Sequence, residues 1–209
     1  MAAEPERILA EGLAELSLAV DAATQEKLLA YVRLLAKWNR AYNLTAVRDP
    51  AGMVVRHLLD SLVLAPYLRG PAVLDVGTGA GLPGIPLALV CPELRFTLLD
   101  SNGKKIRFVT QAVAELGLAN TDVIQSRVED WQAGSRFDTI MARAYSSLAG
   151  LIGQTRHLLA EGGRYLLMKG VWPTAEIADL PAGFRLVGAP RLAVPGLAAE
   201  RHVVMIEAA

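Results

Sequence analysis

The stretch from residue 73 to residue 84 constrains the fold of this chain more than any other part of the sequence. It reads VLDVGTGAGLPG, so a short apolar strand passes directly into a glycine-rich turn and then into a helix. Glycine lets the backbone adopt positive φ angles and approach a ligand closely, and such turns hold nucleotide-like cofactors. The stretch therefore predicts a strand–turn–helix unit of an α/β sheet, with a ligand seated on the turn.

Short β-rich runs alternate with helical stretches along the chain from residue 72 onward. A parallel crossover needs an element long enough to span the sheet, so this alternation predicts a doubly wound α/β sheet with helices on both faces. The last two runs have no helix between them and predict an antiparallel pair that completes a seven-stranded, Rossmann-like sheet. The expected strands are residues 72–76, 95–99, 122–125, 139–141, 164–168, 184–189 and 202–207.

An amphipathic helix is expected ahead of the sheet, over residues 26–38, where apolar side chains recur at helical spacing. A second helix is expected over residues 51–67, because Pro50 suits a helix start. The chain is thus predicted to form an N-terminal helical layer over residues 1–70, packed on a sheet domain over residues 71–209.

The charges of the chain limit the kinds of partner it can attract. Its 21 basic residues balance 21 acidic ones, so any site for a polyanion must be a local patch. A single cysteine excludes an internal disulfide. No apolar run reaches membrane-spanning length, and the first residues lack the order of a secretory signal. We therefore expect a cytoplasmic protein without membrane contact.

The glycine spacing of residues 79–84, G-x-G-x-x-G, is shared by sites for NAD and for S-adenosylmethionine. A carboxylate at Asp75 would be unfavourable beside the pyrophosphate of NAD, whereas S-adenosylmethionine carries an ammonium and a sulfonium group. Pro83 and Pro86 also remove backbone N–H groups that a pyrophosphate would need. The loop, with Asp75 and Gly79 in the site, therefore favours S-adenosylmethionine.

Side chains that follow the second and third strands are candidates for the adenosine half of this cofactor. Asp100 ends the second strand where a carboxylate can accept both ribose hydroxyls, although it could also cap the next helix. Val128 would contact the adenine ring and Glu129 its polar edge. The alternative for residues 126–130 is a solvated acidic turn.

The atom that receives the methyl group can be narrowed by the residues the cleft offers. Methylation of an exocyclic amine needs polar acceptors at the end of the fourth strand, but residues 142–145 read Ala-Arg-Ala-Tyr. Methylation of a pyrimidine carbon needs a cysteine nucleophile, and Cys91 lies before the second strand, away from the cleft. A ring nitrogen such as N7 of guanine remains. Arg143 could hold the methionine carboxylate or the guanine oxygen, or could form a surface ion pair.

Two further polar clusters have plainer alternatives. His57, Asp60 and Ser61 suggest a hydrolase triad, but they fall within about one helical turn and favour local hydrogen bonding. The basic residues among 104–107 could meet phosphates, although such a cluster is more often a solvated helix face.

Several motifs together closely resemble the bacterial RsmG (GidB) family. They are WNRAYNLT at residues 38–45, RHLLDS at 56–61, the glycine loop, QSRVE at 125–129, MKG at 168–170 and ERH at 200–202. The resemblance implies methylation of N7 of one guanine in 16S rRNA, with S-adenosylmethionine as methyl donor and the small ribosomal subunit or its precursor as substrate. One departure is Ala80, where relatives often carry proline.

The resemblance also implies roles for particular residues. The family's cofactor contacts fall on Gly77, Leu82, Val128, Glu129 and Arg143, and Arg143 is the catalytic candidate. Beyond what the resemblance implies, we expect Arg127, Lys169 and Arg201 to contact an RNA phosphate or the guanine. We expect no metal ion and no obligatory protein partner. A small-molecule methyltransferase, an NAD-dependent oxidoreductase and a non-catalytic binding module stay open as alternatives.

Overall fold

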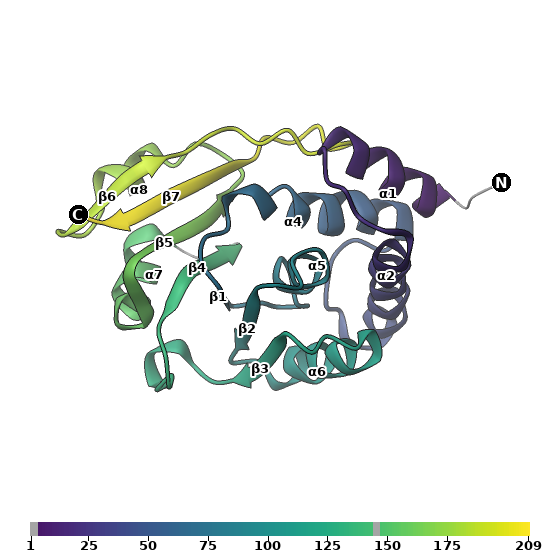
Figure 1. The fold of residues 1–209 in the computed structure, drawn as a ribbon, viewed down its shortest axis with the longest axis horizontal. Helices are drawn as coiled ribbons and strands as arrows, with labels where there is room; N and C mark the ends of the chain where they lie inside the picture. Colours follow the sequence, from purple (N-terminus) through teal and green to yellow (C-terminus); the bar gives the residue numbers. More distant parts are fainter. Residues whose placement is uncertain (1–3, 144–146) are drawn as a thin grey trace.

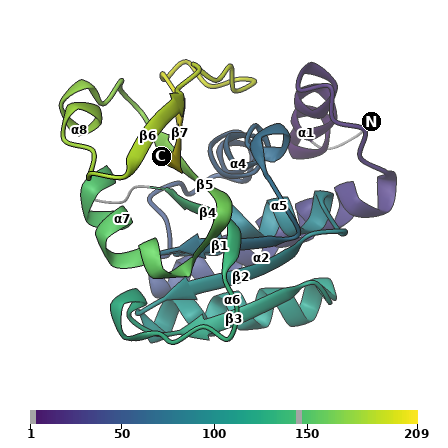
Figure 2. The ribbon, with the colours of Figure 1, turned by 60° about the vertical axis from the view of Figure 1, so that its left-hand side comes forward.

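A computed structural model describes residues 4–143 and 147–209. They form a seven-stranded sheet in the order β3-β2-β1-β4-β5-β7-β6. All neighbouring strands pair in parallel except β7, which is antiparallel to both β5 and β6 (Figures 1 and 2). The strands are β1 (Ala72–Val76), β2 (Arg95–Asp100), β3 (Thr121–Gln125), β4 (Phe137–Arg143), β5 (Leu159–Lys169), β6 (Phe184–Gly188) and β7 (His202–Ala208).

Helices cover both faces of the sheet, as Figure 1 shows with α5 and α6 on one side and α7 on the other. The crossover helices are α5 (Gly84–Val90), α6 (Gly103–Leu116), η3 (Val128–Asp130), α7 (Leu148–Thr155), η4 (Arg156–Leu158) and α8 (Thr174–Ala178). The N-terminal helices are α1 (Glu4–Glu15), α2 (Ala22–Tyr42), α3 (Pro50–Met53), the π-helical segment η1 (Val54–Leu59), α4 (Asp60–Leu62) and the 3-10 turn η2 (Ala65–Tyr67).

The bounds of α2 follow from its capping residues. The side chain of Asp21 accepts a hydrogen bond from the backbone N–H of Thr24 at 2.6 Å, which satisfies a free donor of the first turn. The helix ends at Asn43, whose φ of 49° is left-handed and whose N–H donates to the Asn39 carbonyl. Local sequence thus sets the length of the helix that borders the cleft described below.

Two apolar clusters fill the molecule, one on each face of the sheet. Along β5, Leu166 and Met168 belong to the first cluster, whereas Tyr165 and Leu167 belong to the second. This alternation reflects the period of two along a strand that is buried on both faces. The first cluster also takes in apolar side chains of the N-terminal helices, such as Leu28. The helical layer and the sheet therefore share one core.

The layer also contacts the glycine loop directly through Tyr31. This side chain on α2 is fully buried, and its hydroxyl donates a 2.7 Å hydrogen bond to the carbonyl of Ala80. Burial raises the pKa of Tyr31 well above its ordinary value, so the hydroxyl stays protonated and remains a donor. The position of the loop thus depends on the N-terminal helices.

The fold class, the seven strands and the antiparallel terminal pair expected from the sequence are confirmed. The helix predicted over residues 51–67 is present over residues 50–62 but is not a regular α-helix, because it passes from α3 through the π-helical η1 into α4 and is followed by the separate 3-10 turn η2. A wide π turn is not visible in a 3.6-residue pattern, and Pro66 has no N–H to continue a helix. Helix α1 was not predicted, since only Leu9, Gly12 and Leu13 of it are buried. The domain division between residues 1–70 and 71–209 stays a prediction.

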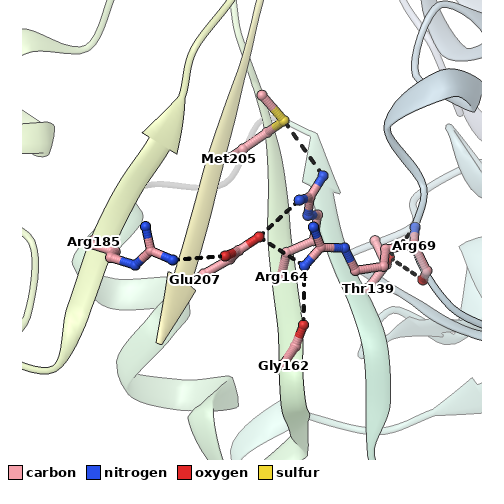
Figure 3. A network of polar contacts seen from close by, with 7 residues as sticks. All are labelled: Arg69, Thr139, Gly162, Arg164, Arg185, Met205 and Glu207. Atoms are coloured by element: carbon pink, nitrogen blue, oxygen red, sulfur yellow. Dashed lines mark hydrogen bonds and ion pairs between the residues drawn. The ribbon is translucent and has the colours of Figure 1, made fainter. Parts of the chain in front are cut away.

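A group of arginines around Glu207 ties the layer to the sheet away from the carboxyl ends of the parallel strands (Figure 3). The Glu207 carboxylate lies 2.9 Å from Arg69, 2.8 Å from Arg164 and 3.3 Å from Arg185. The backbone of Arg69 is held by Thr139, whose hydroxyl accepts from its N–H at 2.9 Å and donates to its carbonyl at 2.7 Å. Hydrogen bonding to Arg164 and the charges of all three arginines lower the pKa of Glu207.

Candidate active site

A cleft lies at the carboxyl ends of the parallel strands, where β1 separates β2 from β4 and the strand order reverses. This is where open α/β sheets bind their ligands. Three neighbouring cavities make up the cleft. The β2–β3 cavity measures about 180 Å³, the loop cavity about 300 Å³ and the β4–β5 cavity about 430 Å³. Gly77 lines the first two, and His57 and Arg143 line the last two, so the cavities follow one another across the sheet.

The glycine loop has the geometry of a ligand cradle. Gly77 and Gly79 have φ angles of 68° and 63°, which side chains rarely adopt. The N–H groups of Gly77 and Thr78 both donate to the Leu99 carbonyl, at 2.8 and 3.0 Å, and fasten the loop to β2. A Cβ atom at Gly77 would meet nothing within 4 Å, so the space above this residue is open. The sequence prediction of a loop that exposes its backbone agrees with this geometry.

Asp75 shapes the loop from beneath. It is fully buried, and Oδ2 accepts hydrogen bonds from the Thr78 hydroxyl at 2.6 Å and the Gly84 N–H at 3.0 Å. Burial raises the pKa of Asp75 to about 6. Asp75 is absent from the described lining of all three cavities. Its direct contact with a cofactor stays a prediction, and the structure adds a role in holding the loop to α5.

Asp100 lines the β2–β3 cavity with acceptor capacity to spare. Its Oδ2 accepts from the Gly79 N–H at 3.0 Å and its Oδ1 from the Asn102 N–H at 2.8 Å. The Lys105 ammonium also lies 3.7 Å from Oδ2, which is too long for a hydrogen bond. A carboxylate has about four lone-pair sites, so roughly half of them remain for hydroxyl donors in the cavity. The alternative role of Asp100 as the cap of α6 is wrong, because Asn102 caps that helix.

The other predicted adenosine contacts line the same cavity. Val128 is buried and offers an apolar surface, whereas Glu129 is exposed and lies 3.7 Å from Arg127. Gln154 on α7 also lines this cavity and was not found from the sequence. No pattern in the sequence separates Gln154 from other polar residues on the surface of a helix.

Asp60 forms ion pairs with two arginines that line the β4–β5 cavity. Its side chain is only 2% exposed and accepts from Arg201 Nε at 2.7 Å and from an Arg143 guanidinium nitrogen at 3.4 Å. The same Arg143 nitrogen lies 3.5 Å from the Arg56 carbonyl. Arg143 at the end of β4 and Arg201 before β7 are thus held on one carboxylate from the N-terminal layer. The sequence indicated only local hydrogen bonds for Asp60, whereas the structure pairs it with two arginines from distant segments.

His57 lies where the loop cavity meets the β4–β5 cavity. Its Nε2 is 2.8 Å from the Thr45 hydroxyl and its Nδ1 is 2.9 Å from the Arg56 carbonyl. Burial, followed by the charge of Arg143, lowers the pKa of His57 to about 4. The neutral ring therefore donates a hydrogen bond from Nδ1 to the carbonyl, and its Nε2 accepts a hydrogen bond from the Thr45 hydroxyl.

A hydrolase triad is excluded by these partners. Ser61 donates to the His57 carbonyl at 2.5 Å, and Asp60 pairs with the arginines instead of the imidazole. The expected local hydrogen bonding is found for Ser61. Cys91 is half-buried, and burial together with Glu93 raises the pKa of its thiol to about 11, which argues against a nucleophile.

The three basic residues predicted to contact RNA lie in two places. Lys169 and Arg201 line the β4–β5 cavity, whereas Arg127 lines the β2–β3 cavity at the other end of the cleft. Lys169 is paired with Glu176 at 2.8 Å, and Arg201 with Asp60. Their RNA contacts stay predictions. Ala144 and Tyr145, used above to argue against amine methylation, lie outside the described residues.

Further lining residues were not identified as cleft residues from the sequence: Leu44 and Thr45 after α2, Arg56 on η1, and Met168 and Gly170 around the end of β5. Within residues 4–143 and 147–209, no group of three or more His, Cys, Asp or Glu side chains could hold a metal ion. In the same residues no helix is both long enough and apolar enough to span a bilayer.

Comparison with known sequences shows the family to which the chain belongs. The profile of the GidB family, described as rRNA small subunit methyltransferase G, matches residues 24–204. The chain belongs to this family. Relatives with the name ribosomal RNA small subunit methyltransferase G occur in Pseudomonas aeruginosa and Stenotrophomonas maltophilia. The first is 55% identical over 95% of this chain and 93% of its own, and the second 52% identical over 95% and 92%.

Solved structures agree on the fold. The glycopeptide N-methyltransferase MtfA, complexed with S-adenosyl-L-homocysteine, superimposes with a TM-score of 0.63 at 13% identity, over 73% of this chain and 87% of its own. Members of the rRNA small subunit methyltransferase G family use S-adenosylmethionine, so this chain is an S-adenosylmethionine-dependent methyltransferase. The alternatives of an NAD-dependent oxidoreductase and a non-catalytic module are thereby set aside.

Proposed function

We propose that this chain transfers the methyl group of S-adenosylmethionine to N7 of a specific guanine in 16S rRNA of the small ribosomal subunit. The observation that carries the proposal is the place of Arg143, which lines both the loop cavity and the β4–β5 cavity. A side chain shared by two adjoining cavities can orient a donor in one and an acceptor in the other. The family and the names of its members supply the class of acceptor.

The donor fits the β2–β3 and loop cavities. Free acceptor sites on Asp100 would take the ribose hydroxyls, and Val128 would pack on the adenine ring beside Glu129. The open space above Gly77 would admit the methionine part of the donor, with its carboxylate toward Arg143. Bound there, S-adenosylmethionine supplies an electrophilic methyl group.

The acceptor guanine fits the β4–β5 cavity. N7 has an in-plane lone pair, so the N–C bond can form as the S–C bond breaks without a base to remove a proton. The electron pair of the broken bond would stay on the sulfur of the donor, and the positive charge would pass to the guanine ring. Arg143 can donate to the guanine O6, and the Asp60 carboxylate beneath offsets the arginine charge near a ring that becomes cationic.

A small-molecule acceptor is the second candidate, favoured by the balance of 21 basic and 21 acidic residues. The test is transfer of labelled methyl to undermethylated small subunits and to naked 16S rRNA, followed by mapping of the modified base. Label at N7 of a guanine supports the proposal and identifies the form of the substrate. Donor binding without incorporation into either RNA would favour the small-molecule candidate.

A matched pair of glycine variants tests whether S-adenosylmethionine binds at the glycine loop. Gly77→Asp is expected to abolish donor binding, because it places bulk and negative charge in the open space of the loop. Gly117→Asp is the control, since Gly117 has a similar φ of 65° and equally open space but ends α6 away from the cleft. Equal affinities of the two variants for S-adenosylmethionine, measured by calorimetry, would contradict the proposed donor site.

We propose further that the enzyme works in the cytoplasm without a protein partner.

A further inference from the structure

The turn after β5 exposes two large apolar side chains at the rim of the β4–β5 cavity. Val171 is 76% exposed and Trp172 is 44% exposed, immediately after Gly170, which lines the cavity. Tryptophan is normally much more buried than this in a folded chain. These two side chains have no role in the donor or guanine sites proposed above.

The turn is held firmly enough to keep the indole in place. Lys169 and Glu176 close it with an ion pair at 2.8 Å, and Glu176 also accepts from the Leu148 N–H at 2.8 Å. The indole contacts the imidazole of His202 edge to face, with centroids 5.6 Å apart and planes at 81°. An indole that is supported by one neighbour and still half exposed can offer ring surface to a partner.

The charges of the cavity that the turn borders indicate the chemistry of that partner. Arg56, Lys169 and Arg201 line the adjoining cavity. The exposed guanidinium of Arg56 makes no ion pair or hydrogen bond with any described residue. A cation in the cavity and an exposed aromatic ring on the turn that borders the cavity together suit a nucleotide, which brings both a phosphate and a base. An apolar protein surface would instead desolvate the arginine without compensation.

We propose that Trp172 stacks on the base of an unpaired nucleotide next to the target guanine and so selects single-stranded RNA as substrate. The inference rests on the proposed function and extends it to the RNA outside the guanine cavity. Stacking would hold the neighbouring nucleotide unstacked from the guanine, so that the guanine enters the cavity with N7 toward the donor. Arg56 would pair with the phosphate between the two nucleotides.

The test compares Trp172→Ala and Trp172→Phe with the wild type in methylation of undermethylated 16S rRNA. Trp172→Ala is expected to raise the KM for RNA roughly 10-fold, as loss of one stacked base does, and to leave the affinity for S-adenosylmethionine unchanged. Trp172→Phe is expected to recover most of the loss. Val187→Ala, which trims a side chain 41% exposed on β6, is the control for loss of surface apolar area and should leave KM unchanged.

A second readout keeps the inference testable if Trp172→Ala does not fold. The chain has 3 tryptophans, and stacking on a base quenches indole emission, so addition of 16S rRNA should quench the wild type more than Trp172→Phe. Equal quenching, or an unchanged KM for Trp172→Ala, would overturn the inference. Loss of donor affinity in Trp172→Ala would overturn it as well, because the role would then be structural. A wild type that methylates no RNA would contradict the proposed function itself.

Discussion

Two carboxylates in this molecule each gather arginines from distant parts of the chain, but at opposite ends of the sheet. Glu207 holds Arg69, Arg164 and Arg185 away from the cleft (Figure 3). Asp60 holds Arg143 and Arg201 within it. The contacts are chemically alike, and only the second group lines a cavity of the active cleft. An arginine cluster therefore indicates function here only when its donors border space that a ligand can fill.

The largest expected effect is that of Arg143→Ala. The variant removes the side chain shared by the donor and acceptor cavities, so kcat/KM should fall by roughly 100-fold while the fold is retained. Arg185→Ala is the matched control, because it removes an arginine from the Glu207 group. For both variants, kcat/KM for the RNA is measured at a saturating concentration of S-adenosylmethionine. Wild-type turnover in Arg143→Ala would show that the arginines paired with Asp60 are no more important for methyl transfer than those paired with Glu207.

Asp60→Asn should lower methyl transfer by about 10- to 100-fold. The amide keeps the shape of the carboxylate but loses the charge that holds Arg143 and Arg201, so both guanidinium groups can shift. Single-turnover rates with donor and RNA in excess separate this loss from weaker binding. If the rate is unchanged while the protein melts at a lower temperature, Asp60 is a structural residue like Glu207.

Glu207→Gln should show the reverse pattern. The free energy of unfolding is expected to fall by about 1–2 kcal/mol, because charge-assisted hydrogen bonds to Arg69 and Arg164 are weakened. Methyl transfer should stay at the wild-type rate. Urea unfolding and the transfer assay check the two halves, and a fall in rate without a fall in stability would contradict the structural assignment.

Acidification should affect the two regions in different pH ranges. The pKa of His57 is lowered to about 4 from about 6.5, so unfolding takes up a proton and the contribution of His57 to stability declines from pH 6.5 toward 4. The pKa of Glu207 is also lowered, so its contribution is present above about pH 4.3 and is lost as the pH falls through the folded pKa.

Differences between variants isolate these contributions from that of Asp75. The pKa of Asp75 is raised to about 6, so this residue opposes His57 between pH 6 and 4. The free energy of unfolding of the wild type minus that of His57→Asn should therefore decrease as the pH falls from 6.5 to 4. The same difference for Glu207→Gln should change only at lower pH. Parallel curves for the two variants would show that the assigned pKa shifts are wrong.

The sequence predicted those parts of the fold and site that depend on neighbours in the chain. The glycine loop, the strands and the place of Asp100 at the end of β2 follow from local pattern, and the structure has them as expected. The Asp60–Arg201 pair joins residues 141 positions apart, and no local pattern indicates such a contact. The π turn at η1 lies just before Asp60 and changes the helical register, which a 3.6-residue period does not show.

The hydrogen bond from Tyr31 to Ala80 bears on the order in which the molecule is made. Synthesis proceeds from the amino end, so α2 leaves the ribosome before the loop that its tyrosine must meet. Until β1 and the loop emerge, that hydroxyl has no native partner. The growing chain cannot bind its donor until residues on both sides of this contact have emerged, so a methyl donor would not be taken up by a half-made enzyme.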